Sequence, residues 1–519
     1  EITVRDWSSD VCSSDLFATR VPDPVLQQLE DPTSLDVSVN DAFRPVSRFF
    51  DRINRPEQLI PSLLNAMRVL TDPAETGAVT IAMPQDVQAE AFDWPVEFFR
   101  KRVWHVRRPV PEPAALERAV ALIKAAKRPL IIAGGGTIYA GASEELRALA
   151  TATGIPVGDT QAGKGAINFD HPSAVGGVGS TGCDSGNHIA DKADLIIGVG
   201  TRYSDFTTAS KTQFKNPDVK FVNINVAPFD AAKESAEMVV ADAREALAAL
   251  TEALADYHVD QSYSDEITAE KEAWLKATER CYHLNHGPLP AQTEVFGALN
   301  ELMGEEDVVI NAAGSMPGDL QALWQARSPL QYHVEYAFSC MGYEVPAAMG
   351  VKLARPDAEV VSIVGDGTYQ MLPMELATVV QENIKVIYVL LQNYGFCSIG
   401  ALSESRGSQR FGTKYRQRGE GSHLADEQVI DGVDIAANAR SWGLDVLEVH
   451  TIEEFKEAYR KAEASDRPTM IHIETDLYGP NPPGSSWWDV PVSGVSELES
   501  TQRAYEDYQR DRKPQRHYL

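Results

Sequence analysis

The sequence VVSIVGDGT at residues 360–368, together with the apolar run 384–391 and the QNYGF that follows it, decides the fold. Both apolar runs read as strands, and residues 371–381 between them read as a helix. Strand, helix and strand within about 30 residues make one βαβ unit, whose crossover is right-handed. Asp366 and Asn393 are then expected at one crevice, at the carboxyl ends of parallel strands, where ligands bind in open α/β sheets.

The residue types at this crevice restrict the kind of ligand that can bind there. The carboxylate of Asp366, the amide oxygen of Asn393 and a nearby backbone carbonyl are hard oxygen donors, which suit Mg²⁺ or Ca²⁺ better than zinc. Gly365 and Gly367 leave the backbone uncovered, so phosphate oxygens can approach closely. The alternative is that Gly-Asp-Gly forms only a tight turn, since Asp-Gly is a common hairpin sequence. The helical segment that follows favours a metal diphosphate.

This pattern, GDG followed by 25 residues and then Asn-x-Gly, resembles the thiamine diphosphate fingerprint of the acetolactate synthase and pyruvate decarboxylase superfamily. The resemblance implies that Asp366, Asn393 and the carbonyl of Gly395 bind Mg²⁺. It also implies that Gly365, Gly367 and Thr368 hold the diphosphate of the cofactor.

Two further segments are candidates for cofactor contacts. Residues 339–348, SCMGYEVPAA, resemble the MGxxxPAA segment of the same superfamily, in which the methionine is an apolar wedge that bends the cofactor. Met341 takes that place, with core packing as the alternative. Gly314 and Ser315 follow a predicted strand at 307–311, where backbone and hydroxyl groups can hold phosphate or the aminopyrimidine. An ordinary strand-to-helix turn explains that segment equally well.

Composition excludes several classes of partner. The net charge of −28 argues against nucleic acid and anionic membranes, which demand clustered Lys and Arg. No apolar run approaches the roughly 18 residues that a membrane helix needs. The five cysteines are scattered and never form a CxxC pair, which favours a reducing, cytoplasmic location and disfavours zinc.

We expect an α/β protein with three doubly wound parallel-sheet domains, the first of them incomplete. A length of 519 residues suits about three domains. The predicted organisation is a non-native segment at 1–16, the C-terminal remnant of a pyrimidine-binding domain at 17–106, a central Rossmann-like domain at 113–257, a diphosphate- and Mg²⁺-binding domain at 291–477, and a C-terminal tail with a helix at 478–519.

The predicted elements of the first two domains can be stated by range. In the first we expect a helix at 56–70 and a strand at 78–83. In the second we expect strands at 130–133, 195–200 and 220–226, a turn at 134–136 and a helix at 142–153. The GGG at 134–136 begins an incomplete GxGxxG, because residue 139 is Tyr, and no convincing ribose-binding acid follows.

The tail is expected to carry a helix from a capping box at 496–499 to about residue 512. For Trp487 and Trp488, packing onto the body of the protein is favoured over a lid function.

Three segments narrow the resemblance to one branch. Residues 332–336, residues 398–405 with 407–413, and residues 487–490 with 495–496 and the helical stretch 502–505 are similar to the hydrolases that open trihydroxycyclohexane-1,2-dione to 5-deoxyglucuronic acid in myo-inositol breakdown, through the thiamine diphosphate ylide. The implied substrate is a small polyhydroxylated cyclic dione. Residues 398–416 and His333 are candidate contacts to it, although His333 is equally expected to be structural. The resemblance also implies a homo-oligomer.

The resemblance is incomplete in one respect. Members of the family activate the cofactor with a Glu near the start of the pyrimidine-binding domain, and no Glu in 17–106 has the right surroundings. The catalytic residue is therefore left unassigned, and almost no turnover is expected from this chain. Two alternatives remain open: a carboligase or decarboxylase of the acetolactate synthase type acting on 2-oxoacids, and a non-catalytic truncated fragment.

Overall fold

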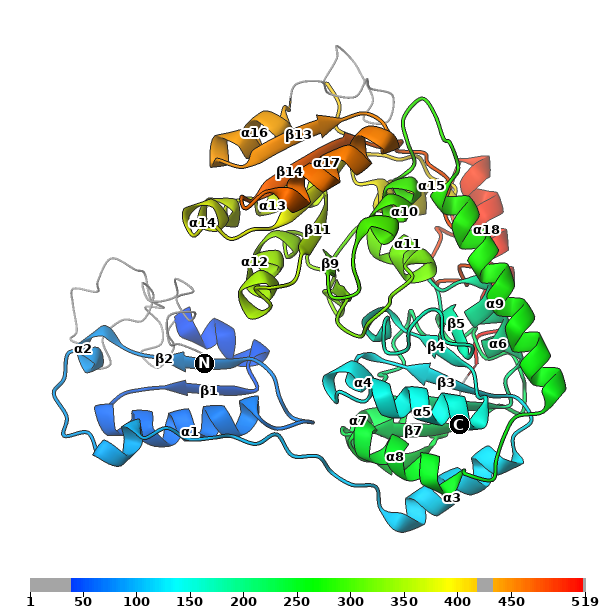
Figure 1. Cartoon of the computed structure of the whole chain (residues 1–519), viewed down its shortest axis with the longest axis horizontal. Coiled ribbons are helices and arrows are strands. Elements are labelled where there is room, and N and C mark those ends of the chain that lie inside the picture. Colours follow the sequence, from blue (N-terminus) through cyan, green and yellow to red (C-terminus); the bar gives the residue numbers. More distant parts are fainter. Residues whose placement is uncertain (1–38, 418–432, 517–519) are drawn as a thin grey trace. The chain divides into compact units, whose positions relative to one another are not determined.

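The computed structural model describes residues 39–417 and 433–516 (Figure 1). These fall into two compact units, which meet in sequence between Pro109 and Val110, inside the Pro- and Arg-rich linker. The segment 1–16 lies outside the described residues.

The first unit contains one βαβ repeat. Strands β1 (Phe49–Arg52) and β2 (Val79–Ala82) pair in parallel, with Phe49 opposite Val79, and α1 (Leu59–Leu70) connects them. The predicted helix and the predicted strand are confirmed, while β1 was missed because FFDR is short and half charged. Its other helical turns are η3 (Val39–Val46), η4 (Pro56–Gln58), α2 (Gln85–Gln88) and η5 (Val96–Phe99).

The central sheet of the second unit has six parallel strands in the order β5-β4-β3-β6-β7-β8. This order is that of a Rossmann fold, with its reversal between β3 and β6. The strands are β3 (Pro129–Ala133), β4 (Val157–Asp159), β5 (Ala174–Gly177), β6 (Leu195–Val199), β7 (Lys220–Asn225) and β8 (Glu237–Val240). The helical segments are α3 (Pro113–Ala125), α4 (Gly135–Tyr139), α5 (Ser143–Thr153), η6 (Gln161–Gly163), α6 (Asp184–Lys192), α7 (Pro228–Ala231), η7 (Lys233–Ser235) and α8 (Ala243–Ala253).

The glycines after β3 pack against the loop after β6. A Cβ atom on Gly136 would lie 2.7 Å from the Cα of Gly200, and one on Gly134 would lie 2.6 Å from the Cα of Thr201. The N–H groups of Gly134 and Gly136 donate to the carbonyls of Val199 and Gly200 at 2.8 and 3.0 Å. Close backbone packing at the strand-order reversal therefore accounts for these glycines, and GGG extends into α4 instead of ending in a turn.

The 22-residue helix α9 (Gln261–Tyr282) connects the two sheets of the second unit and contacts elements of both, including β5, α6, α10 and α11. Its Trp274 Nε1–H and Tyr282 hydroxyl donate to the carbonyls of Ala322 and Leu323, at 2.8 and 2.7 Å, at the end of α11. The next carbonyl, that of Trp324, accepts from Lys164 Nζ at 3.3 Å. Side chains from elsewhere thus satisfy three consecutive carbonyls that a helix end leaves without intrahelical partners.

The C-terminal sheet also has six parallel strands, in the order β10-β9-β11-β12-β14-β13. The strands are β9 (Val308–Asn311), β10 (Tyr332–Val334), β11 (Val360–Gly365), β12 (Ile387–Gln392), β13 (Asp445–Val449) and β14 (Thr469–Glu474). The helices are α10 (Gln292–Leu302), α11 (Met316–Leu323), α12 (Glu344–Ala354), α13 (Asp366–Met371), α14 (Glu375–Gln381), α15 (Cys397–Ser405), α16 (Ile435–Trp442) and α17 (Ile452–Ala464). Together the two sheets confirm the predicted doubly wound α/β class.

Successive residues of the central strands enter two different cores. In β12, Ile387, Val389 and Leu391 pack with α10, α11 and α17, whereas Tyr388 and Leu390 pack with α12, α14 and α16. Because strand side chains alternate between faces, an unbroken apolar run such as IYVLL suits a sheet covered by helices on both sides.

The helix predicted at 371–381 is wrong in its limits. The structure has two helices there, α13 beginning at Asp366 itself and α14 beginning at Glu375. Leu372 between them has φ −151° and ψ 66°. The physical reason is Pro373, since a residue before proline is disfavoured in the helical region.

The tail packs on the central sheet's side of the second unit. Trp488 Nε1–H donates to Asp205 Oδ2 at 2.8 Å, and its ring lies 5.1 Å from that of Phe206. The expected packing is confirmed for Trp488, whereas the ring of Trp487 stacks on that of Tyr508 in the tail itself, at 6.2 Å. The capping box at 496–499 is wrong, because the N-cap of α18 (Glu499–Asp511) is Leu498, two residues after Ser496, and no side chain caps it.

Candidate cofactor site

Asp366 and Asn393 meet as the sequence predicted. The backbone N–H groups of Asn393 and Tyr394 donate to Asp366 Oδ2 at 3.2 and 2.6 Å, and that of Gly367 donates to Oδ1 at 2.8 Å. The parallel pairing of β11 with β12, with Gly365 opposite Leu391, brings the two strand ends to the same edge. Burial raises the pKa of Asp366 to about 6, although these amide hydrogen bonds oppose the shift.

The side-chain amide oxygen of Asn393 lacks a hydrogen-bond donor. Its Oδ1 is buried and has no hydrogen-bond partner among the described residues. A buried amide oxygen left without a partner costs free energy, so such an atom needs an explanation. An oxygen-preferring cation beside the buried Asp366 carboxylate explains it, because both oxygens are of the type that Mg²⁺ binds.

Gly395 lies where the chain turns back on itself. Tyr394 has φ 59°, and Gly395 forms an isolated antiparallel bridge with Lys414. The N–H of Phe396 donates to the carbonyl of Thr413 at 2.8 Å, and the N–H of Tyr415 donates to that of Tyr394 at 2.8 Å. This short ladder fixes the backbone around the third predicted metal ligand.

Glycines leave open space at the two strand ends. A Cβ atom on Gly314, which has φ +89°, would meet nothing within 4 Å. One on Gly365 would touch only Met316 Cε, at 3.5 Å. Side chains at these positions would fill a cradle that the backbone leaves free, as close approach of a diphosphate requires.

Thr368, predicted to contact the diphosphate, is buried and already hydrogen-bonded. Its hydroxyl lies 3.3 and 3.2 Å from the two carboxylate oxygens of Glu344 and accepts from the N–H of Gly342 at 2.8 Å. Glu344 also accepts from the N–H groups of Ala313 and Gly342, at 3.4 and 3.2 Å. Burial raises the pKa of Glu344.

Ser315 lies in a second polar cluster, at the start of α11. Its hydroxyl donates to Gln292 Oε1 at 3.1 Å, and Gln292 Nε2 also donates to the buried carboxylate of Asp319. Burial raises the pKa of Asp319 to about 7.

Met341 is half-buried and belongs to neither hydrophobic core of the C-terminal sheet. It follows a loop in which Ala337 and Ser339 have φ 147° and 51°. Glu335 accepts from the N–H of Cys340 at 2.7 Å and so holds this loop. Its place outside the cores disfavours the core-packing alternative, and its contact with the cofactor stays a prediction.

The candidate substrate contacts are largely occupied by neighbours. His333 Nε2 lies 2.7 Å from the Tyr343 hydroxyl, and burial lowers the pKa of His333. In the 398–416 segment, Arg410 pairs with Glu404 at 2.9 Å and lies over the ring of Tyr478. These contacts give both groups structural roles and leave their part in substrate binding a prediction.

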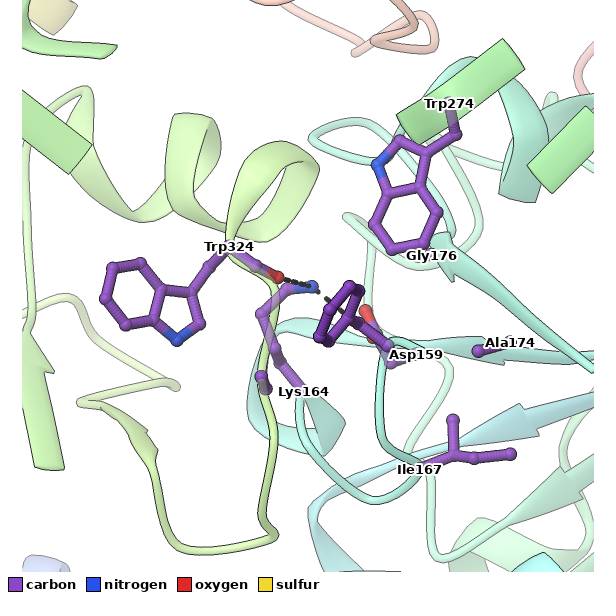
Figure 2. A pocket seen from close by; sticks show the side chains of 9 residues that line it. Asp159, Lys164, Ile167, Ala174, Gly176, Trp274 and Trp324 are labelled. Atoms are coloured by element: carbon purple, nitrogen blue, oxygen red, sulfur yellow. Dashed lines mark hydrogen bonds and ion pairs between the residues drawn. The ribbon is translucent and has the colours of Figure 1, made fainter. Parts of the chain in front are cut away.

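A small cavity lies away from this site, among Asp159, Lys164, Trp274 and Trp324 (Figure 2). Lys164 Nζ lies 3.4 Å from Asp159 Oδ2, and burial raises the pKa of this aspartate. The cavity has room for about one water molecule, so it is too small for a cofactor.

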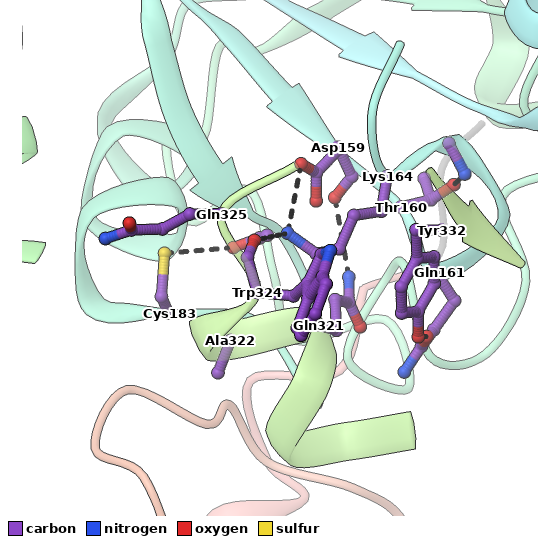
Figure 3. A network of polar contacts seen from close by, with 12 residues as sticks. Asp159, Thr160, Gln161, Lys164, Cys183, Gln321, Ala322, Trp324, Gln325 and Tyr332 are labelled. Atoms are coloured by element: carbon purple, nitrogen blue, oxygen red, sulfur yellow. Dashed lines mark hydrogen bonds and ion pairs between the residues drawn. The ribbon is translucent and has the colours of Figure 1, made fainter. Parts of the chain in front are cut away.

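The cavity belongs to a polar network that connects the central sheet to α11 and β10 (Figure 3). Gln161 Nε2 donates to the carbonyl of Pro317 at 2.7 Å and Gln161 Oε1 accepts from the Tyr332 hydroxyl at 3.1 Å. Gln321 Nε2 lies 3.4 Å from the carbonyl of Asp159. This network fixes α11, the helix that begins at the cofactor cradle.

Two further features are absent from residues 39–417 and 433–516. No group of three or more His, Cys, Asp or Glu side chains in this part of the chain could hold a metal. No helix of the same part is long and apolar enough to cross a bilayer.

Comparisons with known proteins agree with this geometry. Residues 116–250 match the central domain of thiamine pyrophosphate enzymes, and residues 312–473 match their C-terminal TPP binding domain. The chain therefore belongs to the thiamine pyrophosphate enzymes. It is 46% identical over 516 residues to the 3D-(3,5/4)-trihydroxycyclohexane-1,2-dione hydrolases of Bacillus cereus (strain AH820) and Bacillus anthracis (strain CDC 684 / NRRL 3495). Each alignment covers 95% of this chain and 80% of the relative. The hydrolase of Bacillus thuringiensis (strain Al Hakam) is 45% identical over the same coverage.

Three polar residues of the site were missed from the sequence: Glu344, Gln292 and Asp319. Glu344 falls on a position that the MGxxxPAA pattern leaves open, so no motif points to it. Gln292 and Asp319 lie 27 positions apart on separate helices, and only the packing of those helices brings them together.

Proposed function

We propose that the chain binds thiamine diphosphate with Mg²⁺ and acts on a carbon–carbon bond of trihydroxycyclohexane-1,2-dione, the compound named for its relatives, opening the ring to 5-deoxyglucuronic acid. The observation that supports this most directly is the unpartnered Asn393 Oδ1 beside the buried Asp366 carboxylate.

Each predicted residue would have a distinct part in holding the cofactor. Asp366, Asn393 Oδ1 and the Gly395 carbonyl would hold Mg²⁺. Gly365, Gly367 and Thr368 on one strand end, with Gly314 and Ser315 on another, would surround the diphosphate. The bound cofactor supplies a nucleophilic carbon and an electron sink for cleavage between two carbonyl carbons. Met341, half-buried beside the cradle loops, would shape the bound cofactor.

The surroundings of Asp366 hold its carboxylate in place for a cation. Asp366 is fully buried, and three backbone amides fix its orientation before any cation arrives. Preorganised ligands spare the ordering cost that binding otherwise includes.

The domain limits 17–106, 113–257, 291–477 and 478–519 are part of the same proposal, as are a homo-oligomeric state and a cytoplasmic location. The four described cysteines are all free, which supports a reducing compartment. The activating glutamate remains unassigned, and the expectation of little turnover stays a prediction that an assay of dione consumption tests.

Calorimetric titration of the chain with thiamine diphosphate and Mg²⁺ tests the proposal. We expect binding that requires Mg²⁺ and that is lost in Asp366→Ala. Binding should persist in Asp357→Ala, because Asp357 is exposed and precedes β11 at the opposite end of the strand from Asp366. Absence of binding in a chain shown to be folded would contradict the cofactor assignment. Turnover of 2-oxoacids in place of the dione would favour the acetolactate synthase-type alternative, and binding without any turnover would favour the non-catalytic one.

A further inference from the structure

The carboxylate of Glu344 contacts two loops and one helix of the cofactor cradle. It accepts from Ala313 in the loop after β9, from Gly342 beside Met341, and from the Thr368 hydroxyl in α13. The side chain is fully buried, and its own backbone carbonyl accepts from Ser362 Oγ of β11 at 3.0 Å.

Both oxygens of this carboxylate serve as acceptors. Oε1 faces the amide of Ala313 and Oε2 faces the amide of Gly342, while the Thr368 hydroxyl lies between the two oxygens. Only a group with two acceptor oxygens satisfies these donors together. A glutamine of the same shape would turn its NH₂ toward one of the backbone N–H groups.

The arrangement also determines the direction of the Thr368 hydroxyl. A hydroxyl has a single hydrogen, and in Thr368 that hydrogen is directed to Glu344, while its oxygen accepts from Gly342. The hydroxyl hydrogen of Thr368 is therefore already engaged by Glu344.

We propose that Glu344 is a positioning residue of the cofactor site. Its carboxylate holds the loop that contains Met341 and the loop 313–315 in fixed positions relative to Thr368. This inference rests on the proposed function, because it assumes that these loops surround the diphosphate and the ring system of thiamine diphosphate. Glu344 acts through its neighbours, without touching the cofactor itself.

Cofactor binding by variants tests the inference. Residues that orient a binding shell typically contribute about 10- to 100-fold to affinity, so Glu344→Gln is expected to raise the Kd for thiamine diphosphate with Mg²⁺ by that factor. The matched control is Glu294→Gln: Glu294 is also buried and accepts two backbone amides, those of Ala291 and His286 at 3.0 and 3.4 Å, away from the cradle loops. This control is expected to bind the cofactor as the unchanged chain does.

A double-mutant cycle with Thr368→Val separates positioning from general destabilisation. If Glu344 acts partly through the Thr368 hydroxyl, the double variant should bind at least about threefold more tightly than the product of the two single effects predicts. Additive effects, or equal weakening in Glu294→Gln, would overturn the inference.

Amide hydrogen exchange of the cofactor-free chain gives a second readout. Glu344→Gln should speed exchange in peptides that cover Gly342 and Ala313 by about tenfold or more, and leave β13 unchanged. Unchanged exchange at both positions would overturn the inference, even in a chain that binds no cofactor. Failure of the unchanged chain to bind would instead count against the proposed function alone.

Discussion

The carboxylate of Asp366 accepts the backbone N–H of Tyr394, 28 positions later, at 2.6 Å. This bond joins the ends of two adjacent parallel strands. It also holds the turn in which Tyr394 takes φ 59°, next to Gly395. The same carboxylate therefore has a structural partner and, in our proposal, a cation.

Asn393→Leu should change affinity and stability in opposite directions. Leucine has a similar size and no acceptor, so Mg²⁺-dependent binding of thiamine diphosphate should weaken by about 10- to 100-fold. Removal of the buried, unpartnered Oδ1 should stabilise the cofactor-free chain by about 1 kcal/mol. Calorimetry and denaturant unfolding measure the two effects. A variant that is destabilised and binds normally would show that Oδ1 has a structural partner and no cation.

Asp319→Asn should stabilise the chain at alkaline pH and not at acidic pH. Burial raises the pKa of Asp319 from 3.8 to about 7 in the folded chain. The folded state thus holds this proton more tightly than the unfolded state does. The resulting stabilisation is complete below about pH 4 and is lost as the pH rises to about 7.

The asparagine side chain of the Asp319→Asn variant does not titrate. At pH 8 the free energy of unfolding of the variant should therefore exceed that of the unchanged chain by on the order of 2–4 kcal/mol. The two should converge at pH 4. Thermal midpoints measured across this range test the expectation, with a substitution at the exposed Asp357, Asp357→Asn, measured alongside for comparison. An equal difference at all pH values would mean that packing, and not ionisation, causes it.

Gly136→Ala should destabilise the central sheet. The added Cβ would lie 2.7 Å from the Cα of Gly200, and backbone cannot move aside as a flexible side chain can. We expect a loss of about 2 kcal/mol or more, typical of overpacking. Gly350→Ala, in a helix where the added Cβ meets nothing within 4 Å, should be neutral or up to about 1 kcal/mol stabilising. Similar thermal midpoints for both variants would contradict the packing argument.

Trp488→Ala should release the tail without unfolding the sheets. The indole ring packs on Phe206, and its Nε1–H donates to Asp205. Limited proteolysis should therefore cleave the 478–486 loop several-fold faster, while the main thermal transition stays in place. Trp488→Phe keeps most of the ring contact and should lie between the two. Unchanged cleavage in the alanine variant would place the tail's attachment elsewhere, for instance at Arg516, which donates to the carbonyl of Phe214 at 2.8 Å.

The sequence predicted those parts of the site whose residues lie in one supersecondary unit. The meeting of Asp366 with Asn393 follows from strand ends in a βαβ repeat, so spacing along the chain was enough. The break at Leu372 was missed although Pro373 is visible in the sequence, because the apolar period alone suggested one helix. Glu344 with Ala313, and Gln292 with Asp319, were beyond reach because their contacts depend on how whole helices pack.

The hydrogen bonds to the three carbonyls at the end of α11 limit which parts of this chain can be exchanged independently. Trp274, Tyr282 and Lys164 come from the connecting helix and the central sheet, yet they secure the helix whose first turn borders the cofactor cradle. An exchange of the C-terminal sheet between relatives would therefore have to carry the connecting helix and the 159–164 loop with it. A crossover near Pro109 breaks none of these bonds, so chimeras joined there should tolerate recombination better than chimeras joined between the two six-stranded sheets.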